Sequence, residues 1–334
     1  MTKKPAVAIY GLWPDLRAYT RQKLRKFLVT IHPDIIKLDE LGPRTDFLAV
    51  FIESPVTKQV MAKLPHLKGV ASMSTGYDHI DLVEAKKRKI PVSNVPSYGE
   101  NTVAEHTFAL MLALTRRLFD SAKRVKEGRY DFGGLRGVDL KGRTLGVIGT
   151  GHIGAHVIRI AKGFEMNVLA YDVRPKADLA KTLGFSYVTL PKLLKQSDIV
   201  TLHTPLFKEN YHLLNKKTIA LMKKGSYLIN TARGALVEPA AVLGALNSGR
   251  LAGAGLDVLE DEKLLQNFEE VMHCKNNNCK LQTSLINNLL IDHPNTIITP
   301  HNAFNSTEAL KRIIDVTAQN LEGFAAGHPI NLVR

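Results

Sequence analysis

The stretch from Leu140 to Asp172 constrains the fold of this chain more than any other part of the sequence. An apolar run at 144–148 predicts a buried parallel strand, and the glycine-rich turn GTGHIG at 149–154 follows it directly. A helical pattern comes next, and a second apolar run at 168–171 ends on Asp172. This order of strand, glycine-rich turn, helix, strand and acidic residue is typical of a dinucleotide-binding βαβ unit.

The glycines of this unit have separate physical roles in holding a dinucleotide. Gly149 permits a tight turn, Gly151 lets the backbone approach a pyrophosphate, and Gly154 lets the helix pack closely on the strand. The N-terminus of the helix offers free N–H groups and the positive end of its dipole to the phosphates. A glycine-rich turn alone also occurs in purely structural loops, but the flanking strands and the acid favour dinucleotide binding here.

Asp172 indicates which dinucleotide the unit takes. Its carboxylate can accept hydrogen bonds from a ribose 2′-hydroxyl and would repel a 2′-phosphate, so NAD is expected rather than NADP. Arg174, two residues further on, would hold a 2′-phosphate if its side chain turned inward, so the choice of cofactor calls for a direct test.

Length and composition are those of an ordinary globular protein. At 334 residues, with 45% hydrophobic and 23% charged residues, the chain is expected to form two domains. No apolar run reaches the length of a membrane span, and the first residues lead into a short strand instead of a signal peptide. The only cysteines are Cys274 and Cys279, so a disulfide framework is not expected and a cytoplasmic location is.

The net charge of +14 permits two interpretations. Basic runs such as 86–89 can contact polyanions, but the same runs are typical of solvated helix faces and turns. No basic stripe with interleaved aromatic residues is present, so specific nucleic-acid binding is not expected. The positive field would still help to collect small anionic substrates.

Strands alternate with helices along most of the chain, which predicts parallel sheets with crossover connections. In the first part, a helix is expected at 15–28. Strands are expected at 6–10, 46–52, 69–73 and 91–95, and after Asp172 at 199–202, 226–229, 253–256 and 296–299.

Two long helices mark the organisation of the chain. A helix over 101–125 is apolar on more than one face and is expected to be buried between domains or against a second subunit. A last helix, 307–324, comes after the dinucleotide unit is complete, so we expect it to return to the first domain. The predicted domains are therefore 1–99 with 305–334, and 100–304.

Polar residues follow several of the strands in the second half of the chain. His203-Thr204-Pro205, Asn230 to Gly234, Asp257 and His301 all lie where a strand is expected to end. Ligands bind at the carboxyl ends of the strands in open α/β sheets, so these residues are candidates for a binding or catalytic site.

Several motifs in this order resemble the family of D-isomer-specific 2-hydroxyacid dehydrogenases, over nearly the whole chain, and in detail its D-lactate dehydrogenase branch. They are the runs STGYDHID at 74–81, VPSYGENTVAEH at 95–106, GTGHIG at 149–154, NTARG at 230–234, GLDV at 255–258 and PHNAF at 300–304. The resemblance implies two doubly wound parallel-sheet domains: a Rossmann-type NAD domain and a flavodoxin-like substrate domain. The catalytic cleft is expected at their junction.

The resemblance also implies the catalytic residues. Arg233 corresponds to the arginine that clamps the substrate carboxylate, a role that suits a planar guanidinium with two parallel donors. His301 corresponds to the general acid/base, and imidazole titrates in the range that this role needs. Glu260, Asp261 and Glu262 are consecutive acids among which the residues alone do not choose; the resemblance selects Glu262 as the partner that favours the His301 imidazolium.

Other contacts are carried over from the same resemblance. For the cofactor they are Gly149, Gly151, His152, Ile153, Gly154, Asp172, Thr204, Pro205, Asn210, Thr231, Ala232, Arg233 and Asp257, with Asp257 beside the nicotinamide. For the substrate they are backbone N–H groups around Ser74, Thr75 and Gly76, the Arg233 clamp, and Tyr98 and Phe304 as the walls of the pocket. Tyr98 as plain interdomain packing is the competing interpretation. A homodimer through the 101–125 helix is also implied.

The stretch between Glu262 and His301 departs from the family pattern, because it is longer than usual and rich in asparagine. His273, Cys274 and Cys279 within it raise the question of a metal site, but a zinc site needs four ligands and no matching second pair is present. No metal is therefore expected.

Three functions compete at this point. The leading one is NAD-dependent interconversion of D-lactate and pyruvate. The second is oxidation of another 2-hydroxy acid, larger or phosphorylated, or of phosphite. The third is a non-enzymatic NAD-binding regulator, but such a protein does not require Arg233, Glu262 and His301 together.

Overall fold

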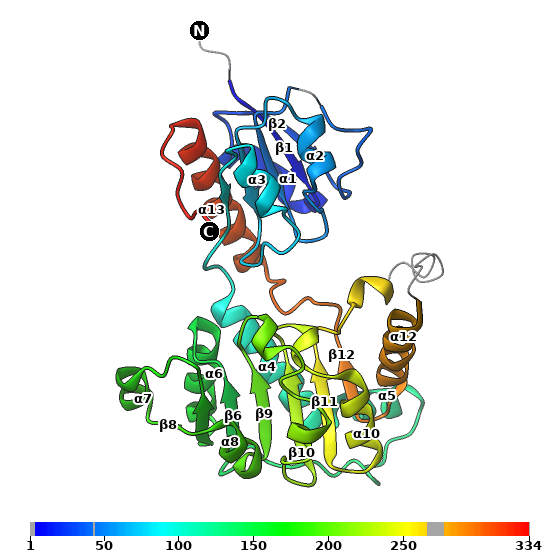
Figure 1. Cartoon of the computed structure of the whole chain (residues 1–334). Helices are drawn as coiled ribbons and strands as arrows, with labels where there is room; N and C mark the ends of the chain where they lie inside the picture. The colour runs from blue at the N-terminus through cyan, green and yellow to red at the C-terminus, as the bar shows by residue number, and fades with distance from the viewer. Residues whose placement is uncertain (1–3, 43, 266–276, 334) are drawn as a thin grey trace. The chain divides into compact units, whose positions relative to one another are not determined.

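Two separate parallel β-sheets, each in its own unit of the chain, form the framework of the protein (Figure 1). The computed structural model describes residues 4–42, 44–265 and 277–333. Unit 1 comprises Met1–Tyr98 with Asn305–Arg334, and unit 2 comprises Gly99–Phe304. The parallel sheets and their helical crossovers confirm the fold class expected from the alternation of strands and helices.

Unit 1 has a five-stranded sheet of order β2-β1-β3-β4-β5 in which every neighbouring pair is parallel. This is the strand order of flavodoxin-like folds. The strands are β1 (Ala6–Tyr10), β2 (Leu28–His32), β3 (Phe47–Val50), β4 (Gly69–Ser72) and β5 (Val92–Ser93). The helices are η1 (Pro14–Leu16), α1 (Arg17–Lys23), α2 (Lys58–Lys63), α3 (Leu82–Lys87) and α13 (Thr307–Ala325).

The C-terminal helix α13 is an integral part of unit 1, where it packs on β4 and α1. The ring of Phe324 lies so close to Gly69 that a Cβ atom there would stand 2.6 Å from it. On the other side of the helix, the Tyr19 hydroxyl donates to Asp315 at 2.9 Å. The late helix therefore packs on the sheet formed by the first part of the chain.

The sequence interpretation was wrong about the segment after α1. The helix expected over 15–28 ends at Lys23, and after a turn at 24–27 the chain forms the edge strand β2, paired with β1 from Ala6↔Leu28 to Tyr10↔His32. Leu24 and Phe27 are buried, which suggested a helical face, but they lie in the turn between the two elements. The β-branched run 29–31 is the signal that should have indicated a strand.

Unit 2 has a seven-stranded parallel sheet of order β12-β11-β10-β9-β6-β7-β8. The order reverses between β6 and β9, as in Rossmann folds, and ligands bind beyond the carboxyl ends of the strands at such a switch point. The strands are β6 (Thr144–Ile148), β7 (Asn167–Tyr171), β8 (Ser186–Tyr187), β9 (Ile199–Leu202), β10 (Ser226–Asn230), β11 (Leu251–Leu256) and β12 (Thr296–Ile298).

Helices cover both faces of this sheet and bury two separate apolar cores. Leu145 and Val147 face the core that α4 and α6 close, whereas Val200 and Leu202 face the core closed by α8 and α10. The helical elements of unit 2 are α4 (Glu100–Thr115), α5 (Leu118–Lys126), α6 (His152–Gly163), α7 (Ala177–Leu183), α8 (Leu190–Gln196), η2 (Lys208–Asn210), α9 (Lys216–Ile219), η3 (Gly234–Leu236), α10 (Pro239–Asn247), η4 (Glu262–Leu265) and α12 (Asn277–Asp292).

The helix expected over 101–125 is two helices, α4 and α5, because Arg117 adopts a left-handed backbone conformation with φ of 49° between them. Helix α4 is buried within unit 2 against α6 and β11. Helix α5 has no buried residue, and Leu118 and Phe119 on it are 58% and 61% exposed. The apolar residues of this stretch therefore belong to two different places: those of α4 lie in the core of unit 2, and those of α5 lie on its surface.

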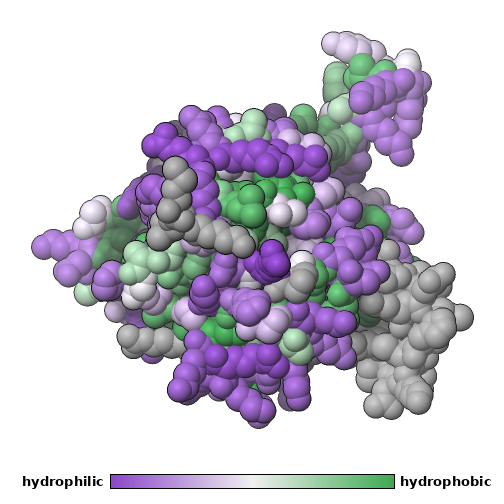
Figure 2. All heavy atoms as spheres, turned by 90° about the horizontal axis from the view of Figure 1, so that it is seen from above, coloured by the Kyte–Doolittle hydropathy of each residue, from purple (hydrophilic) through white to green (hydrophobic). Residues whose placement is uncertain are grey.

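The surface is mostly hydrophilic on the face shown in Figure 2, where hydrophobic residues form small groups among polar ones. The basic run 86–89 is exposed at the end of α3, as expected for a solvated helix end. Across the described ranges, no helix is long and apolar enough to cross a membrane.

Candidate active site

The glycine-rich turn after β6 has the geometry of a phosphate cradle. Gly149 has a φ of 93°, and a Cβ atom on it would lie 2.6 Å from the carbonyl oxygen of His203. A Cβ atom on Gly154 would lie 2.1 Å from the Gly149 carbonyl oxygen, so the first turn of α6 touches the loop backbone. At Gly151, the N-cap of α6, nothing lies within 4 Å of the added atom, and the cradle is open there. His152 and Ile153 begin the helix beside this opening.

Asp172 lies at the end of β7 and is bonded to the same turn. Its Oδ2 accepts hydrogen bonds from the backbone N–H and the hydroxyl of Thr150, at 2.7 and 2.8 Å, and its Oδ1 accepts from the backbone N–H of Arg174 at 2.8 Å. Burial alone would raise the pKa of Asp172, but these hydrogen bonds lower it below the usual value. A charged carboxylate therefore stands beside the cradle, where it fits a ribose diol and opposes a 2′-phosphate.

The loop after β9 lies beside the glycine-rich turn and forms a wall of the cradle. Asn210 folds this loop, because its Nδ2 donates to Pro205 O at 2.8 Å and its Oδ1 accepts from Phe207 N at 2.6 Å. Thr204 precedes Pro205 in the same loop. His203 has Nε2 2.9 Å from the Thr201 hydroxyl, and burial lowers its pKa to about 3, so this imidazole is neutral at physiological pH.

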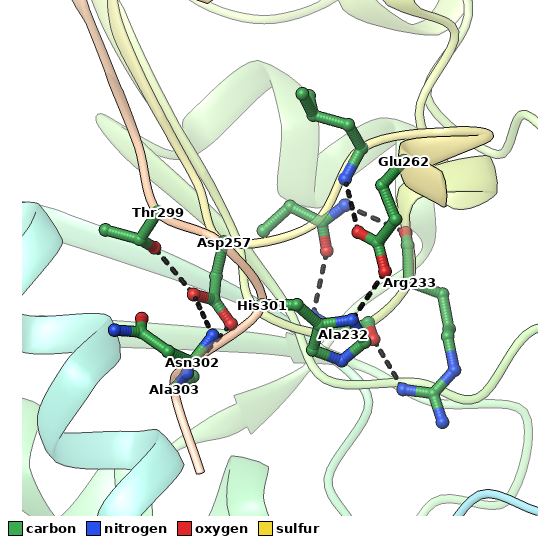
Figure 3. A network of polar contacts seen from close by, with 10 residues as sticks. Ala232, Arg233, Asp257, Glu262, Thr299, His301, Asn302 and Ala303 are labelled. Carbon is green, nitrogen blue, oxygen red and sulfur yellow. Dashed lines mark hydrogen bonds and ion pairs between the residues drawn. The ribbon is translucent and has the colours of Figure 1, made fainter. Parts of the chain in front are cut away.

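Arg233 follows β10 in a turn that Asn230 shapes. The Asn230 side chain donates to Arg233 O at 2.9 Å and accepts from Ala232 N at 3.0 Å. The Arg233 Nη1 donates to Ala232 O at 2.7 Å (Figure 3), and the guanidinium forms no ion pair within the described part of the chain. Thr231 is tied to α4 through a 3.0 Å contact between its hydroxyl and that of Thr107. The turn thus holds a half-buried guanidinium beyond the end of the sheet.

Glu262 and His301 form an acid–imidazole pair beyond β11 and β12. Oε1 of Glu262 lies 2.6 Å from Nδ1 of His301, and Oε2 accepts a hydrogen bond from Leu259 N at 3.1 Å (Figure 3). His301 has a φ of 51°, a conformation that costs energy in a residue with a side chain, and its N–H donates to Asp257 O at 2.8 Å. The carboxylate holds the ring through Nδ1, so Nε2 is the ring nitrogen left for a substrate.

The three consecutive acids have different surroundings. Glu262 contacts His301, whereas Glu260 contacts Tyr211 and His212 through its two carboxylate oxygens. Asp261 is exposed and has a φ of 52°. The geometry therefore separates residues that the sequence left equivalent.

Asp257 is buried and acts as an anchor for the segment that carries His301. Its Oδ1 accepts from the Thr299 hydroxyl at 2.6 Å and from Asn302 N at 3.0 Å, and its Oδ2 accepts from Ala303 N at 3.0 Å (Figure 3). Burial alone would raise the pKa of Asp257, but His106 and these hydrogen bonds lower it.

His106 of α4 was not assigned a role from the sequence. Its Nε2 lies 3.1 Å from the Thr299 hydroxyl and 3.5 Å from Asp257. Its place in the run VAEH at 103–106 was the available signal, but the partner is more than a hundred positions away and a run of letters does not reveal such a contact.

The residues of unit 1 that are expected to bind substrate lie in two loops: Ser74, Thr75 and Gly76 follow β4, and Tyr98 lies between β5 and α4. The Ser74 hydroxyl donates to Gly76 O at 2.6 Å, and the Thr75 hydroxyl donates to Val95 O at 2.8 Å, so both hydroxyls are used inside the unit. Backbone N–H groups stay the expected donors to a carboxylate. The carbonyl oxygen of Tyr98 accepts from Arg312 Nε at 2.5 Å. Phe304 is the last residue of unit 2, and its role stays a prediction.

The suspected metal ligands fall largely outside the described residues: His273 and Cys274 lie there, as does the first half of the asparagine-rich insertion. Cys279 lies in α12, and its side chain is not described. In the remainder of the chain, no group of three or more histidine, cysteine, aspartate or glutamate side chains could hold a metal ion.

Comparisons with known proteins agree with this site. The family model described as "D-isomer specific 2-hydroxyacid dehydrogenase, NAD binding domain" matches residues 108–303. A glyoxylate reductase of Korarchaeum cryptofilum is 38% identical over 293 residues, which cover 86% of this chain and 82% of that protein. The D-lactate dehydrogenase of Escherichia coli is 38% identical over 282 residues, covering 84% of this chain and 83% of that protein.

Solved structures extend the similarity to the whole chain. The crystal structure of D-lactate dehydrogenase from Aquifex aeolicus, complexed with NAD and lactic acid, matches with a TM-score of 0.84 at 36% identity and covers 96% of both chains. The NAD cradle, the two parallel sheets and these similarities lead to one conclusion. The chain belongs to the D-isomer-specific 2-hydroxyacid dehydrogenase family and is an NAD-dependent oxidoreductase.

Proposed function

We propose that this enzyme interconverts D-lactate and pyruvate, with pyruvate reduced by NADH. The observation that carries the proposal is the 2.6 Å contact between Glu262 and His301, on the same sheet edge as the Arg233 turn. A general acid, its carboxylate partner and a carboxylate clamp are the groups that reduction of a 2-oxo acid needs. The D-lactate dehydrogenases among its relatives support the choice of substrate.

The side chains divide the work between the two ends of the substrate. NADH supplies the hydride that C2 of the oxo acid receives. His301 donates the proton from Nε2 to the carbonyl oxygen, so the C=O group becomes CH–OH. Glu262, on the Nδ1 side, stabilises the imidazolium before the proton leaves and keeps the ring in one tautomer. Arg233 binds the carboxylate through two parallel N–H···O bonds.

The remaining contacts are proposed from unit 1 and from the last residues of unit 2. Backbone N–H groups of Ser74, Thr75 and Gly76 would donate further hydrogen bonds to the carboxylate. Tyr98 and Phe304 would line the space for the side chain of the acid and favour the small methyl group of pyruvate. Reductases for glyoxylate occur among the relatives, so acids with a smaller substituent are the natural competitors.

A panel of 2-oxo acids tests the proposal. Glyoxylate, pyruvate, 2-oxobutyrate, 2-oxoisocaproate and phenylpyruvate are reduced with NADH, and kcat/KM is ranked from the loss of NADH absorbance. Pyruvate is expected to rank first and to give the D-isomer in chiral chromatography. His301→Gln serves as the inactive control. A clear preference for another acid, or an L-product, would refute the assignment.

We also propose that the enzyme is a homodimer that uses the surface around α5. Phe119 on this helix is 61% exposed, and Tyr130 and Phe132 in the loop that follows are 95% and 91% exposed. Apolar side chains in such a group are typical of a protein–protein contact. Light scattering after gel filtration should give twice the chain mass, and Phe119→Ser with Phe132→Ser should give the monomer.

The low cysteine count supports the proposal of a cytoplasmic location for this protein.

A further inference from the structure

One cluster of titratable side chains lies beside the catalytic pair and has no role in the proposed proton transfer. Glu260 accepts a hydrogen bond from the Tyr211 hydroxyl at 2.5 Å through Oε1, and its Oε2 lies 2.9 Å from Nε2 of His212. The rings of Tyr211 and His212 are stacked, with centroids 4.0 Å apart. The Glu260 side chain is only 12% exposed and that of His212 26%, whereas Tyr211 is 54% exposed, so the contact with His212 is the better shielded of the two.

The backbone around Glu260 is held from two further directions. Nδ2 of Asn287, a buried residue of α12, donates to the Glu260 carbonyl oxygen at 2.8 Å. At Gly234 a Cβ atom would lie 2.0 Å from the Leu259 carbonyl carbon, so the turn that carries Glu262 rests directly on the residue after Arg233. Leu259 in turn donates its N–H to Glu262 at 3.1 Å. The position of Glu262 therefore depends on how this turn is held.

His212 also contacts the segment that carries Arg233. Its backbone N–H donates to Ala235 O at 2.9 Å, and Leu214 N donates to Leu236 O at 3.0 Å. The same residue thus reaches the Arg233 segment with its backbone and the Glu262 turn with its imidazole. Its φ of 49° is a left-handed conformation that a residue with a side chain adopts at an energetic cost. Such a cost is tolerated where the surrounding contacts require that geometry.

We propose that Tyr211, His212 and Glu260 form a bridge that positions Glu262 against His301 and holds this pair in register with Arg233. The proposal rests on the proposed function for its catalytic readout. Glu260 is a positioning residue in this proposal, since its side chain contacts Tyr211 and His212 and acts on Glu262 through the turn. Two titratable groups, Tyr211 and His212, contact Glu260, and Glu262 contacts His301; Asp261 between them is exposed.

Three substitutions within one turn separate positioning from a general effect of charge. Glu260→Ala removes both side-chain contacts, whereas Glu260→Gln keeps an oxygen for the Tyr211 hydroxyl and an N–H donor for His212. Asp261→Asn removes an exposed carboxylate next to Glu260 and keeps a residue type that tolerates a positive φ, so it is the matched control. Tyr211→Phe removes a single contact and serves if Glu260→Ala does not fold.

The first measurement is steady-state reduction of the preferred oxo acid. Glu260→Ala should lower kcat about tenfold with KM little changed, because a small displacement of the acid–imidazole pair costs rate rather than carboxylate binding. It should also move the pH profile of kcat toward acid, since a displaced carboxylate favours the imidazolium less. Glu260→Gln should retain most of kcat, and Tyr211→Phe should give a kcat between those of Glu260→Ala and Glu260→Gln. Asp261→Asn should match the unaltered enzyme in kcat and in pH profile. A Glu260→Ala profile equal to that of Asp261→Asn would overturn the proposal.

The second measurement needs no substrate and so separates the two proposals. Nitrogen NMR of protein labelled in histidine follows the titration of His301, whose signals are assigned by their loss in His301→Gln. Glu260→Ala should shift this titration toward acid, and Asp261→Asn should not. If no 2-oxo acid is reduced, the proposed function fails, yet this titration still decides whether Glu260 positions Glu262. An unmoved His301 titration in folded Glu260→Ala means that the bridge has no such role.

Discussion

Oε1 of Glu262 lies 2.6 Å from Nδ1 of His301 although 39 positions of sequence separate the two residues. The contact joins the turn after β11 to the turn after β12, and it arises because parallel neighbouring strands end at the same sheet edge. A carboxylate at Nδ1 accepts a hydrogen bond from the N–H of that nitrogen, which leaves Nε2 to exchange a proton with a substrate oxygen.

Replacing His301 by glutamine should remove proton transfer and leave the binding groups in place. Glutamine can still donate a hydrogen bond but does not titrate, so kcat should fall by roughly 10²–10⁴. The affinity for NADH, measured by quenching of protein fluorescence, should change little. A comparable loss of NADH affinity would mean that the substitution disturbs the fold of the site.

Glu262→Gln should leave substantial activity and move the pH profile of oxo-acid reduction toward acid. Without the carboxylate, the imidazolium of His301 is less favoured, so the protonated form that donates to the substrate persists only at lower pH. The check is kcat/KM for reduction across the pH range, with circular dichroism as the test of folding. An unmoved or alkaline-shifted profile would remove Glu262 from the proposed role.

Arg233→Lys should act on the carboxylate end of the substrate. Lysine keeps the positive charge but loses the planar fork, and with it one of two hydrogen bonds to a charged group. KM for the oxo acid should rise about ten- to a hundredfold, with a smaller change in kcat. A variant that loses kcat at unchanged KM would assign Arg233 to the reacting carbonyl instead.

Much of the architecture follows from patterns within a few residues. Buried parallel strands such as β1, β6 and β9 begin and end where the apolar runs do, because both faces of each strand are covered. The edge strand β2 was missed, since its residues are only partly buried and the short turn before it contains the apolar Leu24 and Phe27, which extend the helical pattern of α1. The break at Arg117 was also missed, because a single left-handed residue leaves the apolar spacing almost unchanged.

In the candidate site, too, the local features were predicted from the sequence and the long-range contacts were not. The glycine-rich turn and Asp172 lie close together in sequence, and the strand, turn and helix that they predict are those observed. The contacts of Glu260, Asp257 and His106 join segments far apart in the chain, and no spacing rule reveals them. The family resemblance pointed to the candidate site residues. The family of the chain is confirmed, whereas the individual roles of these residues stay predictions.

Asp198 allows a test of stability against pH in unit 2. Its carboxylate accepts from Thr144 N at 2.8 Å and from Lys223 Nζ at 2.9 Å; burial alone would raise its pKa, but these partners lower it. A lowered native pKa means that the stabilisation is present above the unfolded pKa of about 3.9 and is lost as pH falls through the native pKa. Asp198→Asn should therefore cost about 1–2 kcal/mol at pH 7.

The measurement is thermal unfolding between neutral and acid pH. The difference in Tm between Asp198→Asn and the unaltered protein should begin to shrink below about pH 4, where the unfolded carboxylate takes up a proton, and should vanish only at a lower pH, where the native carboxylate is protonated as well. The exposed Asp139 supplies the control Asp139→Asn, which should unfold like the unaltered protein at every pH. A Tm difference that stays constant into acid would show that the amide fails for a steric reason and not through loss of charge.

Asp172 should decide between NADH and NADPH. Its lowered pKa keeps the carboxylate charged at neutral pH, where it opposes a 2′-phosphate, so kcat/KM should favour NADH. Asp172→Ala removes the repulsion and also the acceptor for Thr150 and for Arg174 N, so the preference should narrow mainly through weaker use of NADH. The exposed Arg174 side chain is the group that could then meet a 2′-phosphate, and adding Arg174→Ala should lower NADPH use again. Equal use of both cofactors by the unaltered enzyme would contradict the role given to Asp172.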